Sequence, residues 1–290
     1  MIQDIWPHKL NNQYDPQKKA EENSPVFVFQ DRKLLIRPTK DGFELPTAGE
    51  LKTAQAEETL TYLLTLDETA LFLLREDEAV DHHPELQKKE FRLIGMKELR
   101  SEFGFCRERV FTAITAYQLS NWYNDNRFCG SCGSRTMHSL KERAIQCTCC
   151  RRTIYPRIIP AVIVGVVNGD SILLTKYAGR GIHYNALIAG FTEIGETLEE
   201  TVHREVMEEA GIRVKNLRYY KSQPWGIVDD LLAGFYCEVD GDPTIRLDTT
   251  ELKEGSWVRR EDVILQPDDY SLTNEMMKMF KEGKVYSENG

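Results

Sequence analysis

The chain has 290 residues, of which 37 are basic and 46 acidic, so its net charge is −9. This length predicts about two domains, with room for a small third piece, since domains commonly span roughly 100–200 residues. The apolar fraction of 41% and the charged fraction of 29% are ordinary for globular proteins, which excludes a wholly disordered or collagen-like chain. Such an acidic chain is a poor candidate for coating nucleic acid non-specifically, although it could still carry a local basic patch.

Hydropathy and cysteine content predict where the chain resides. The longest apolar run, Ala161 to Val167, is far shorter than the roughly 20 residues that span a membrane. The first residues lack the basic and apolar segments of a secretory leader, so we expect neither export nor membrane insertion. Five of the seven cysteines lie between residues 129 and 150. This odd-numbered, clustered set favours a metal site over disulfides and indicates a reducing, cytoplasmic location.

The first third of the chain predicts a small β-rich domain. Its first 24 residues are polar and read as a loose arm. Apolar runs then predict strands at 25–29, 33–37, 60–66, 70–75 and 91–95. Apolar residues recurring at helical spacing predict a helix from Arg107 to Asn124. We place the domain boundaries at 1–124 for this domain and its closing helix, 125–156 for the cysteine-rich segment and 157–290 for the remainder.

The C-terminal part mixes strands with a few helices. Two apolar runs at 161–167 and 170–176 flank Asn168-Gly169, which is a strong hairpin signal because both residues tolerate positive φ. Further strands are predicted at 183–190, 217–223, 231–239 and 255–258, with helices from Thr197 to Ala210 and from Ser271 onward. This pattern predicts an α+β or α/β sandwich.

The cysteine cluster has the spacing C-x2-C-x14-C-x2-C, formed by Cys129, Cys132, Cys147 and Cys150. Four thiolates from two such pairs suit tetrahedral Zn²⁺ and leave no open position, so the predicted zinc site is structural. Cys149 is a rival ligand, but only Cys150 completes the second C-x2-C pair. The remaining two cysteines lie in apolar contexts and are expected in the core: Cys106 and Cys237.

The segment 190–212, GFTEIGETLEETVHREVMEEAGI, predicts a helix that carries three carboxylates on one side. Thr197 and Glu200 form a capping box, and Gly211 is placed to end the helix. The three carboxylates fall within an arc of roughly 100°, and they belong to Glu205, Glu208 and Glu209. Such a group suits hard divalent cations such as Mg²⁺ or Mn²⁺, although a solvated acidic face is an equally good explanation from the charges alone.

The order of residues decides between these two explanations. Gly190, Glu196, the run from Arg204 to Glu209, and Gly211-Ile212 fit the pattern G-x5-E-x7-R-E-U-x-E-E-x-G-U, where U is apolar. This resembles the box of the Nudix hydrolases at every defined position. The resemblance implies an α/β/α sandwich with a mixed sheet and metal-dependent hydrolysis of a nucleoside diphosphate linked to another moiety. It also implies that Glu205, Glu208 and Glu209 bind Mg²⁺ or Mn²⁺, that Glu209 activates water, that Arg204 orients the glutamates and that Glu196 braces the loop.

Features outside the box are similar to the NADH pyrophosphatase subfamily: a zinc ribbon after a β-rich domain, YPRIIP at 155–160 and SQPW at 222–225. This resemblance implies a homodimer that hydrolyses NAD(H) to nicotinamide mononucleotide and AMP, with removal of NAD caps from RNA in some members. It implies substrate contacts by residues of both subunits and one more metal ligand, Glu251. The implied substrate-binding residues are Phe191 and Tyr155, which would stack on a base, together with Gln223 and Ala189.

The chain departs from that subfamily after SQPW. The subfamily continues with Pro-Phe-Pro and a serine, whereas this chain has Gly226 to Asp230, with Asp229 and Asp230 adjacent. An acidic pair near a phosphate-bearing ligand repels it unless a cation intervenes. Other substrates, such as ADP-ribose or a diadenosine polyphosphate, therefore stay open. A hypothesis from a different functional class is a zinc-ribbon protein that binds nucleic acid or has a regulatory role, because arginines make the ribbon locally basic. The complete set of glutamates in the box argues against this hypothesis.

Overall fold

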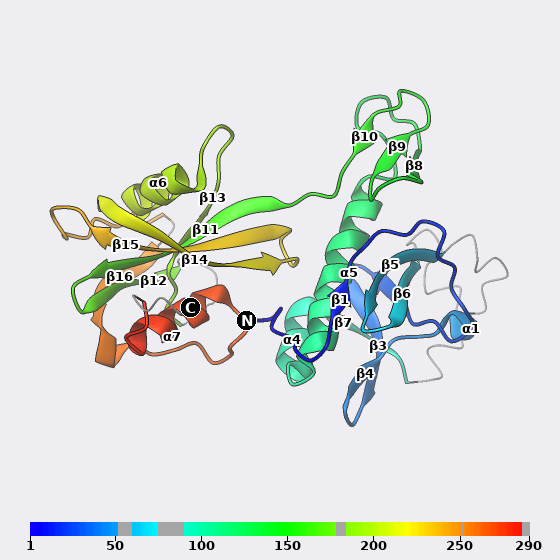
Figure 1. Ribbon diagram of the computed structural model, residues 1–290, viewed down its shortest axis with the longest axis horizontal. Coiled ribbons are helices and arrows are strands. Elements are labelled where there is room, and N and C mark those ends of the chain that lie inside the picture. Colours follow the sequence, from blue (N-terminus) through cyan, green and yellow to red (C-terminus); the bar gives the residue numbers. More distant parts are fainter. Residues whose placement is uncertain (52–59, 75–89, 178–183, 251, 286–290) are drawn as a thin grey trace. The chain divides into compact units, whose positions relative to one another are not determined.

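The computed structural model describes residues 1–51, 60–74, 90–177, 184–250 and 252–285 (Figure 1). The chain forms two compact units. The N-terminal unit comprises Ile2–Arg157 with Gly226–Val228, and the C-terminal unit comprises Met1, Ile158–Trp225 and Asp229–Gly290. Within the described ranges, no helix has the length and apolar character needed to span a bilayer.

The N-terminal unit contains a seven-stranded sheet in the order β1-β5-β6-β2-β3-β4, with β7 paired to β3. Its strands are β1 (Leu10–Asn11), β2 (Val26–Gln30), β3 (Lys33–Thr39), β4 (Gly42–Glu44), β5 (Leu60–Leu66), β6 (Thr69–Leu74) and β7 (Arg92–Gly95). The predicted strands of this region are therefore confirmed. The prediction of a loose arm over the first 24 residues is wrong at β1. There Leu10 pairs with Leu66 and extends the sheet at its edge.

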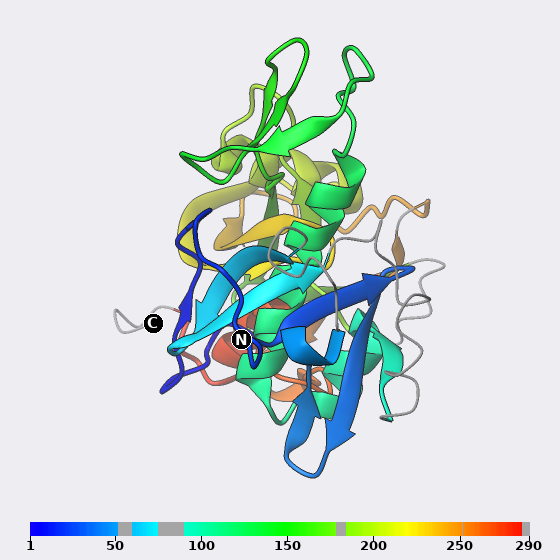
Figure 2. The same ribbon diagram turned by 90° about the vertical axis from the view of Figure 1, so that its right-hand side faces the viewer.

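Helices complete this unit: α1 (Ala48–Leu51), α4 (Met96–Phe103) and α5 (Arg107–Asp125). Helix α5 matches the predicted helix and packs against β2 and β5 (Figure 2). Its buried residues include Val110, Ile114 and Tyr117, the apolar positions of the predicted stripe. The Tyr117 ring meets Phe29 edge-on at 5.7 Å between centroids. These apolar positions of α5 therefore belong to the core.

A small antiparallel sheet follows α5, in the order β10-β9-β8. Its strands are β8 (Thr136–His138), β9 (Ile145–Cys147) and β10 (Thr153–Ile154). The first cysteine pair precedes β8, and the second begins at the end of β9 and lies before β10. We call residues 125–157 the ribbon.

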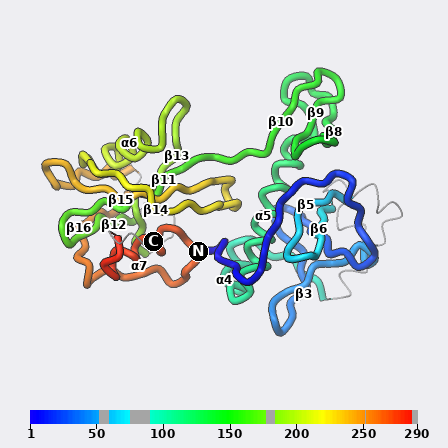
Figure 3. The backbone as a smooth tube through the Cα atoms, in the orientation of Figure 1, coloured from blue at the N-terminus to red at the C-terminus, as the bar shows by residue number. Residues whose placement is uncertain are grey.

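The C-terminal unit is built on a six-stranded mixed sheet in the order β14-β15-β11-β12-β16, with β13 paired to β11. Its strands are β11 (Ile159–Asn168), β12 (Ser171–Tyr177), β13 (Ile188–Phe191), β14 (Val214–Trp225), β15 (Asp230–Val239) and β16 (Leu252–Arg259). Strands β11 and β15 run parallel, and the other pairs are antiparallel. The predicted hairpin is confirmed, because Asn168 pairs with Ser171 across a turn that contains Gly169 at φ 58° (Figure 3).

One helix covers each face of this sheet: α6 (Leu198–Ala210) and α7 (Leu272–Lys281), with the short 3₁₀ helix η3 (Arg260–Asp262) between β16 and α7 (Figure 1). Strand β11 shows why. Its side chains alternate between faces, so Val162 and Val164 pack in the core under α6, whereas Ile163 and Val167 pack in the core under α7. The result is the expected α/β/α sandwich with a mixed sheet.

Candidate active site on helix α6

Local sequence fixes both ends of α6. The Thr197 hydroxyl accepts a hydrogen bond from the Glu200 backbone N–H, and the Glu200 carboxylate accepts one from the Thr197 N–H, at 3.2 and 2.7 Å. This is the predicted capping box. Gly211 ends the helix at φ 67°, a left-handed conformation that favours glycine. The helix is therefore held in register with the loop that precedes it.

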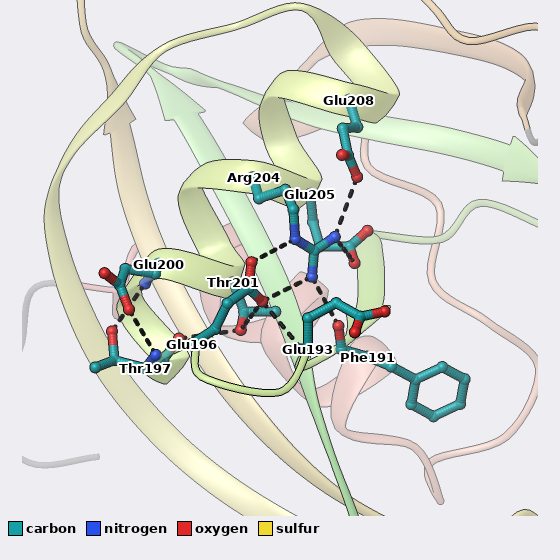
Figure 4. A network of polar contacts seen from close by, with 9 residues as sticks. All are labelled: Phe191, Glu193, Glu196, Thr197, Glu200, Thr201, Arg204, Glu205 and Glu208. Carbon is teal, nitrogen blue, oxygen red and sulfur yellow. Dashed lines mark hydrogen bonds and ion pairs between the residues drawn. The ribbon is translucent and has the colours of Figure 1, made fainter.

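Arg204 organises the carboxylates around that loop (Figure 4). Its Nε and Nη2 donate to the two oxygens of Glu196 at 2.6 and 2.9 Å, a bidentate pair. Its Nη1 donates to Glu205 Oε1 at 2.7 Å and to Glu208 Oε2 at 3.1 Å. Nη2 also donates to the Phe191 carbonyl oxygen at 2.8 Å, so one guanidinium joins β13, the loop and α6.

Glu196 is the anchor of the loop. Besides Arg204, it accepts hydrogen bonds from the Glu193 backbone N–H at 3.1 Å and the Thr201 hydroxyl at 3.0 Å. Arg204 and these donors lower the pKa of Glu196 to about 2. The carboxylate is therefore ionised across the physiological range. The sequence had predicted a bracing role for Glu196, but it gave no signal for the Thr201 contact.

The three predicted metal-binding glutamates of α6 differ in burial. The exposed fractions of Glu205 and Glu209 are 9% and 3%, whereas Glu208 is exposed. Their donor set consists of carboxylate oxygens, which fit a hard divalent cation. In the part of the chain that the structure describes, only the four cysteines gather ligand atoms within 4.8 Å of one another. The glutamate oxygens are more spread, so water molecules would have to complete the coordination of a divalent ion, as Mg²⁺ commonly requires. The predicted ligand Glu251 lies outside the described residues.

The cysteine cluster in the ribbon forms a separate metal-binding arrangement. Cys129 Sγ lies 3.6 Å from Cys150 Sγ, and Cys132 Sγ lies 3.4 Å from Cys147 Sγ. Ligands about 2.3 Å from a tetrahedral zinc ion lie about 3.8 Å apart, so the four sulfurs fit Zn²⁺ closely. Hydrogen bonds from Ser134 and a contact with Cys147 lower the pKa of Cys132 to about 6, which favours the thiolate that binds metal.

The other cysteines lie where the spacing indicated. Cys149 is exposed and is not one of the four clustered residues, although its backbone N–H donates to Cys147 Sγ at 3.4 Å. Cys106 and Cys237 are buried in the core.

Comparison with known proteins identifies the C-terminal unit. The family model for the NUDIX domain matches residues 157–280. These residues form a NUDIX domain. NAD-capped RNA hydrolase NudC of Citrobacter koseri is 44% identical over 150 residues, which cover 52% of this chain and 58% of that protein. The Escherichia coli protein of the same name is 43% identical over the same shares. The chain thus spans a little over half the length of the curated relatives it matches.

A solved NUDIX hydrolase from Nitrosomonas europaea is 20% identical to this chain. The match covers 54% of this chain and 91% of that one, at a TM-score of 0.47.

The predicted substrate residues of the NUDIX domain have different environments. Phe191 is 53% exposed at the end of β13, with its ring directed away from the Arg204 network (Figure 4). Ala189 is half-buried on the same strand, paired with Ile163. Gln223 is fully buried, and its amide donates to the Tyr270 carbonyl and accepts from the Leu272 N–H, both at 2.7 Å. In this structure the Gln223 side chain therefore holds the start of α7.

Tyr155 belongs to the N-terminal unit rather than to the NUDIX domain. Its ring is 58% exposed, and its hydroxyl donates to the Glu142 carboxylate at 3.0 Å. More than half of the Tyr155 surface is therefore accessible to a ligand.

The altered loop after SQPW places a carboxylate in the interior, which the sequence did not foresee. Asp229 adopts φ 65° in the turn, and Asp230 begins β15 opposite Trp225. The exposed fraction of Asp230 is 7%, and its Oδ1 has no hydrogen-bond partner among the described residues. Burial, with a smaller contribution from the Asp229 charge, raises the pKa of Asp230 to about 6.

Proposed function

We propose that this protein is a divalent-metal-dependent pyrophosphohydrolase that converts NAD(H) and water to nicotinamide mononucleotide and AMP. We extend the proposal to NAD caps on RNA, because the relatives at 43–44% identity are named NAD-capped RNA hydrolases. The observation that carries the proposal is the set of carboxylates on α6 arranged around Arg204. In this proposal, the carboxylates of the NUDIX domain hold the metal ions that bind the substrate phosphates and the attacking water.

The reaction adds a water oxygen to one phosphorus of the pyrophosphate and breaks the bond from that phosphorus to the bridging oxygen. In this proposal Glu209 accepts the proton of the water, since its carboxylate is buried on the α6 face that carries Glu205. The leaving phosphate departs with the bridging oxygen. Mg²⁺ or Mn²⁺ held by Glu205, Glu208, Glu209 and Glu251 would supply positive charge that stabilises the pentavalent transition state.

Arg204 and Glu196 act as positioning residues in this proposal. Arg204 already forms ion pairs with three carboxylates, so its charge holds these side chains in position. The metal ions, rather than Arg204, would then bind the substrate phosphates. Phe191, Ala189 and Gln223, with Tyr155 from a second subunit of a homodimer, are the proposed substrate-binding residues. The exposed rings of Phe191 and Tyr155 support stacking on a purine.

A second candidate keeps the reaction and changes the substrate. Asp230 is a buried carboxylate where the related subfamily has serine, in the loop that would read the dinucleotide. ADP-ribose or a diadenosine polyphosphate is therefore the alternative substrate. The predicted zinc is structural in either case, and its thiolates are best preserved in a reducing cytoplasm.

A product assay tests the proposal and separates the two candidates. The zinc-loaded protein is supplied with Mn²⁺ or Mg²⁺ and with NADH, NAD⁺, ADP-ribose and diadenosine polyphosphate in parallel. Fastest release of reduced nicotinamide mononucleotide and AMP from NADH supports the first candidate. Inert NADH with cleavage of another substrate supports the second, and no cleavage of any of them contradicts both.

A further inference from the structure

The ribbon differs in charge from the rest of the chain. Residues 125–157 contain seven basic and two acidic side chains, which sum to +5 in a chain whose formal net charge is −9. The remainder of the chain is therefore at −14. A Zn²⁺ ion on four thiolates adds −2, so the ribbon stays positive at about +3. A positive module in a negative protein attracts polyanions to one place and repels them elsewhere.

Some of these basic side chains are occupied by the fold. Arg143 Nη2 donates to the carbonyl oxygens of Asn12 and Leu63 at 2.8 and 2.7 Å, which ties the ribbon to the N-terminal sheet. Arg152 bonds to the Ser131 hydroxyl of the first knuckle. These hydrogen bonds hold both arginine side chains in place. They therefore add positive charge to the ribbon but are not free to reach a ligand.

Arg127 and Arg135 are different. Both are exposed, and within the described ranges no carboxylate forms an ion pair with either. The Arg135 guanidinium lies 5.5 Å from the centre of the Phe128 ring, and Phe128 and Arg135 face each other across a single β-bridge. The Phe128 ring itself is 53% exposed. Among the residues that the structure describes, this surface thus presents two cations without carboxylate partners beside an exposed aromatic side chain.

A small cavity of about 60 Å³ lies between these arginines. Tyr123 and His138 help to line it, and their rings stack at 4.7 Å with an interplanar angle of 5°. Because a cavity of this measure needs only roughly 10–15 Å³ to hold one water molecule, this one has room for a group of a few heavy atoms, such as one phosphate. Guanidinium forks are suited to phosphate oxygens because they offer paired N–H donors.

We propose that this face of the ribbon, formed by Arg127, Phe128 and Arg135, binds the single-stranded RNA body of a capped substrate. The arginines contact backbone phosphates, and the exposed Phe128 ring stacks with a base. Base stacking on aromatic rings combined with a cationic track is the usual recognition of single strands without sequence preference. The inference rests on the proposed function, since it supplies the contacts that a capped RNA makes beyond its NAD moiety.

Single-stranded RNA explains the combination better than a free nucleotide or a duplex. A free nucleotide would use the cavity but leave much of the surrounding positive charge without a partner. A duplex hides its base faces, so it cannot use the exposed ring of Phe128. With the four thiolates and Zn²⁺ included, the ribbon still carries about +3, which fits a chain of several phosphates.

The test uses the full-length, zinc-loaded protein and the double variant Arg127→Ala/Arg135→Ala. The control is Lys33→Ala/Lys97→Ala, which removes the same charge from exposed positions of the N-terminal unit outside the ribbon. We measure kcat/KM for NADH and for an NAD-capped single-stranded RNA, and the affinity for the same RNA without a cap, each over a range of salt concentrations. Zinc content is measured for every variant.

We expect the arginine variant to retain zinc and its kcat/KM for NADH, and to lose several-fold in kcat/KM for capped RNA. Its salt slope for uncapped RNA should fall by about 1.4, because each single-strand phosphate that an arginine neutralises contributes about 0.7 to that slope. The lysine control should behave as the wild type. Phe128→Leu should weaken RNA binding with little change in the salt slope, because it removes stacking rather than charge.

Two results would overturn this inference and leave the proposed function standing: equal losses in the arginine and lysine variants, or unchanged RNA binding with normal NADH turnover. If the wild type cleaves neither NADH nor capped RNA, the proposed function fails. The binding of uncapped RNA by the variants then decides the role of the ribbon by itself.

Discussion

Gly190 and Glu205 occupy adjoining space that admits no additional atom. A Cβ at residue 190 would lie 1.9 Å from the Glu205 carboxyl carbon. Gly190 does not have a positive φ, so the requirement for glycine comes from this contact rather than from backbone strain. The first glycine of the Nudix-like box therefore allows Glu205 of α6 to reach its position beside Arg204.

Gly190→Ala should displace Glu205 and disturb the Arg204 network. We expect a loss of turnover by at least about tenfold and a decrease in stability of about 1–3 kcal/mol, the usual cost of overpacking. Turnover and chemical denaturation measure both effects. Gly95→Ala is the matched control, because nothing lies within 4 Å of a Cβ built there. Wild-type behaviour of Gly190→Ala would show that the loop adjusts without cost.

The ion pair of Glu196 with Arg204 should make stability depend on pH in the acid range. The folded-state pKa of Glu196, about 2, lies below its ordinary value of 4.5, so its contribution is complete above pH 4.5 and is lost as the pH falls towards 2. We expect Glu196→Gln to be less stable than the wild type at pH 7, with a gap that closes below pH 4.5. Denaturant titrations at several pH values measure the gap. Glu199→Gln, at an exposed position of the same helix, should show no such gap.

Asp230 should act in the opposite direction. Its folded-state pKa of about 6 exceeds the ordinary value of 3.8, so the protein loses stability as the pH rises through 6. A shift of this size corresponds to at most about 3 kcal/mol. Asp230→Asn should therefore be more stable than the wild type at pH 7 and equal to it near pH 4. Asp229→Asn should give a smaller gain, because the charge of Asp229 is the lesser cause. A loss of stability in Asp230→Asn at pH 7 would show that the carboxylate is held by a favourable contact.

The ribbon should depend on its four clustered cysteines and not on the fifth. Cys147→Ser should lower zinc content and destabilise the protein by several kcal/mol, because zinc binding contributes folding free energy. Cys149→Ser should keep the zinc content and the stability of the wild type, since Cys149 is exposed and lies outside the cluster. Zinc analysis and thermal unfolding compare the two. Equal zinc loss in both variants would mean that the ligand set is different.

Periodic and motif-based features of this chain could be read from the sequence, whereas long-range contacts could not. The capping box of α6, the Asn168-Gly169 hairpin and the four-cysteine pattern are local, because spacing along the chain determines which groups meet. The pairing of Leu10 with Leu66 joins residues far apart in sequence, and no periodicity in a polar arm indicates it.

The same distinction holds within the candidate site. The positions of Glu196 and Arg204 follow from the box, but the internal use of the Gln223 amide at Tyr270 and Leu272 depends on where α7 packs. The burial of Asp230 likewise follows from its place at the start of β15 beside β11, which an altered loop sequence does not reveal. The stacking of His138 in the ribbon on Tyr123 of α5 likewise depends on how the chain folds back on itself.

The most direct test of the central claim is NADH turnover by Glu209→Gln with Mn²⁺ present, beside Glu199→Gln from the exposed side of the same helix. If Glu205, Glu208 and Glu209 carry the reaction, Glu209→Gln keeps its fold and zinc but loses turnover by about 10²–10⁴-fold, the usual share of a general base. Glu199→Gln should retain turnover. Undiminished release of nicotinamide mononucleotide and AMP by Glu209→Gln would contradict the account.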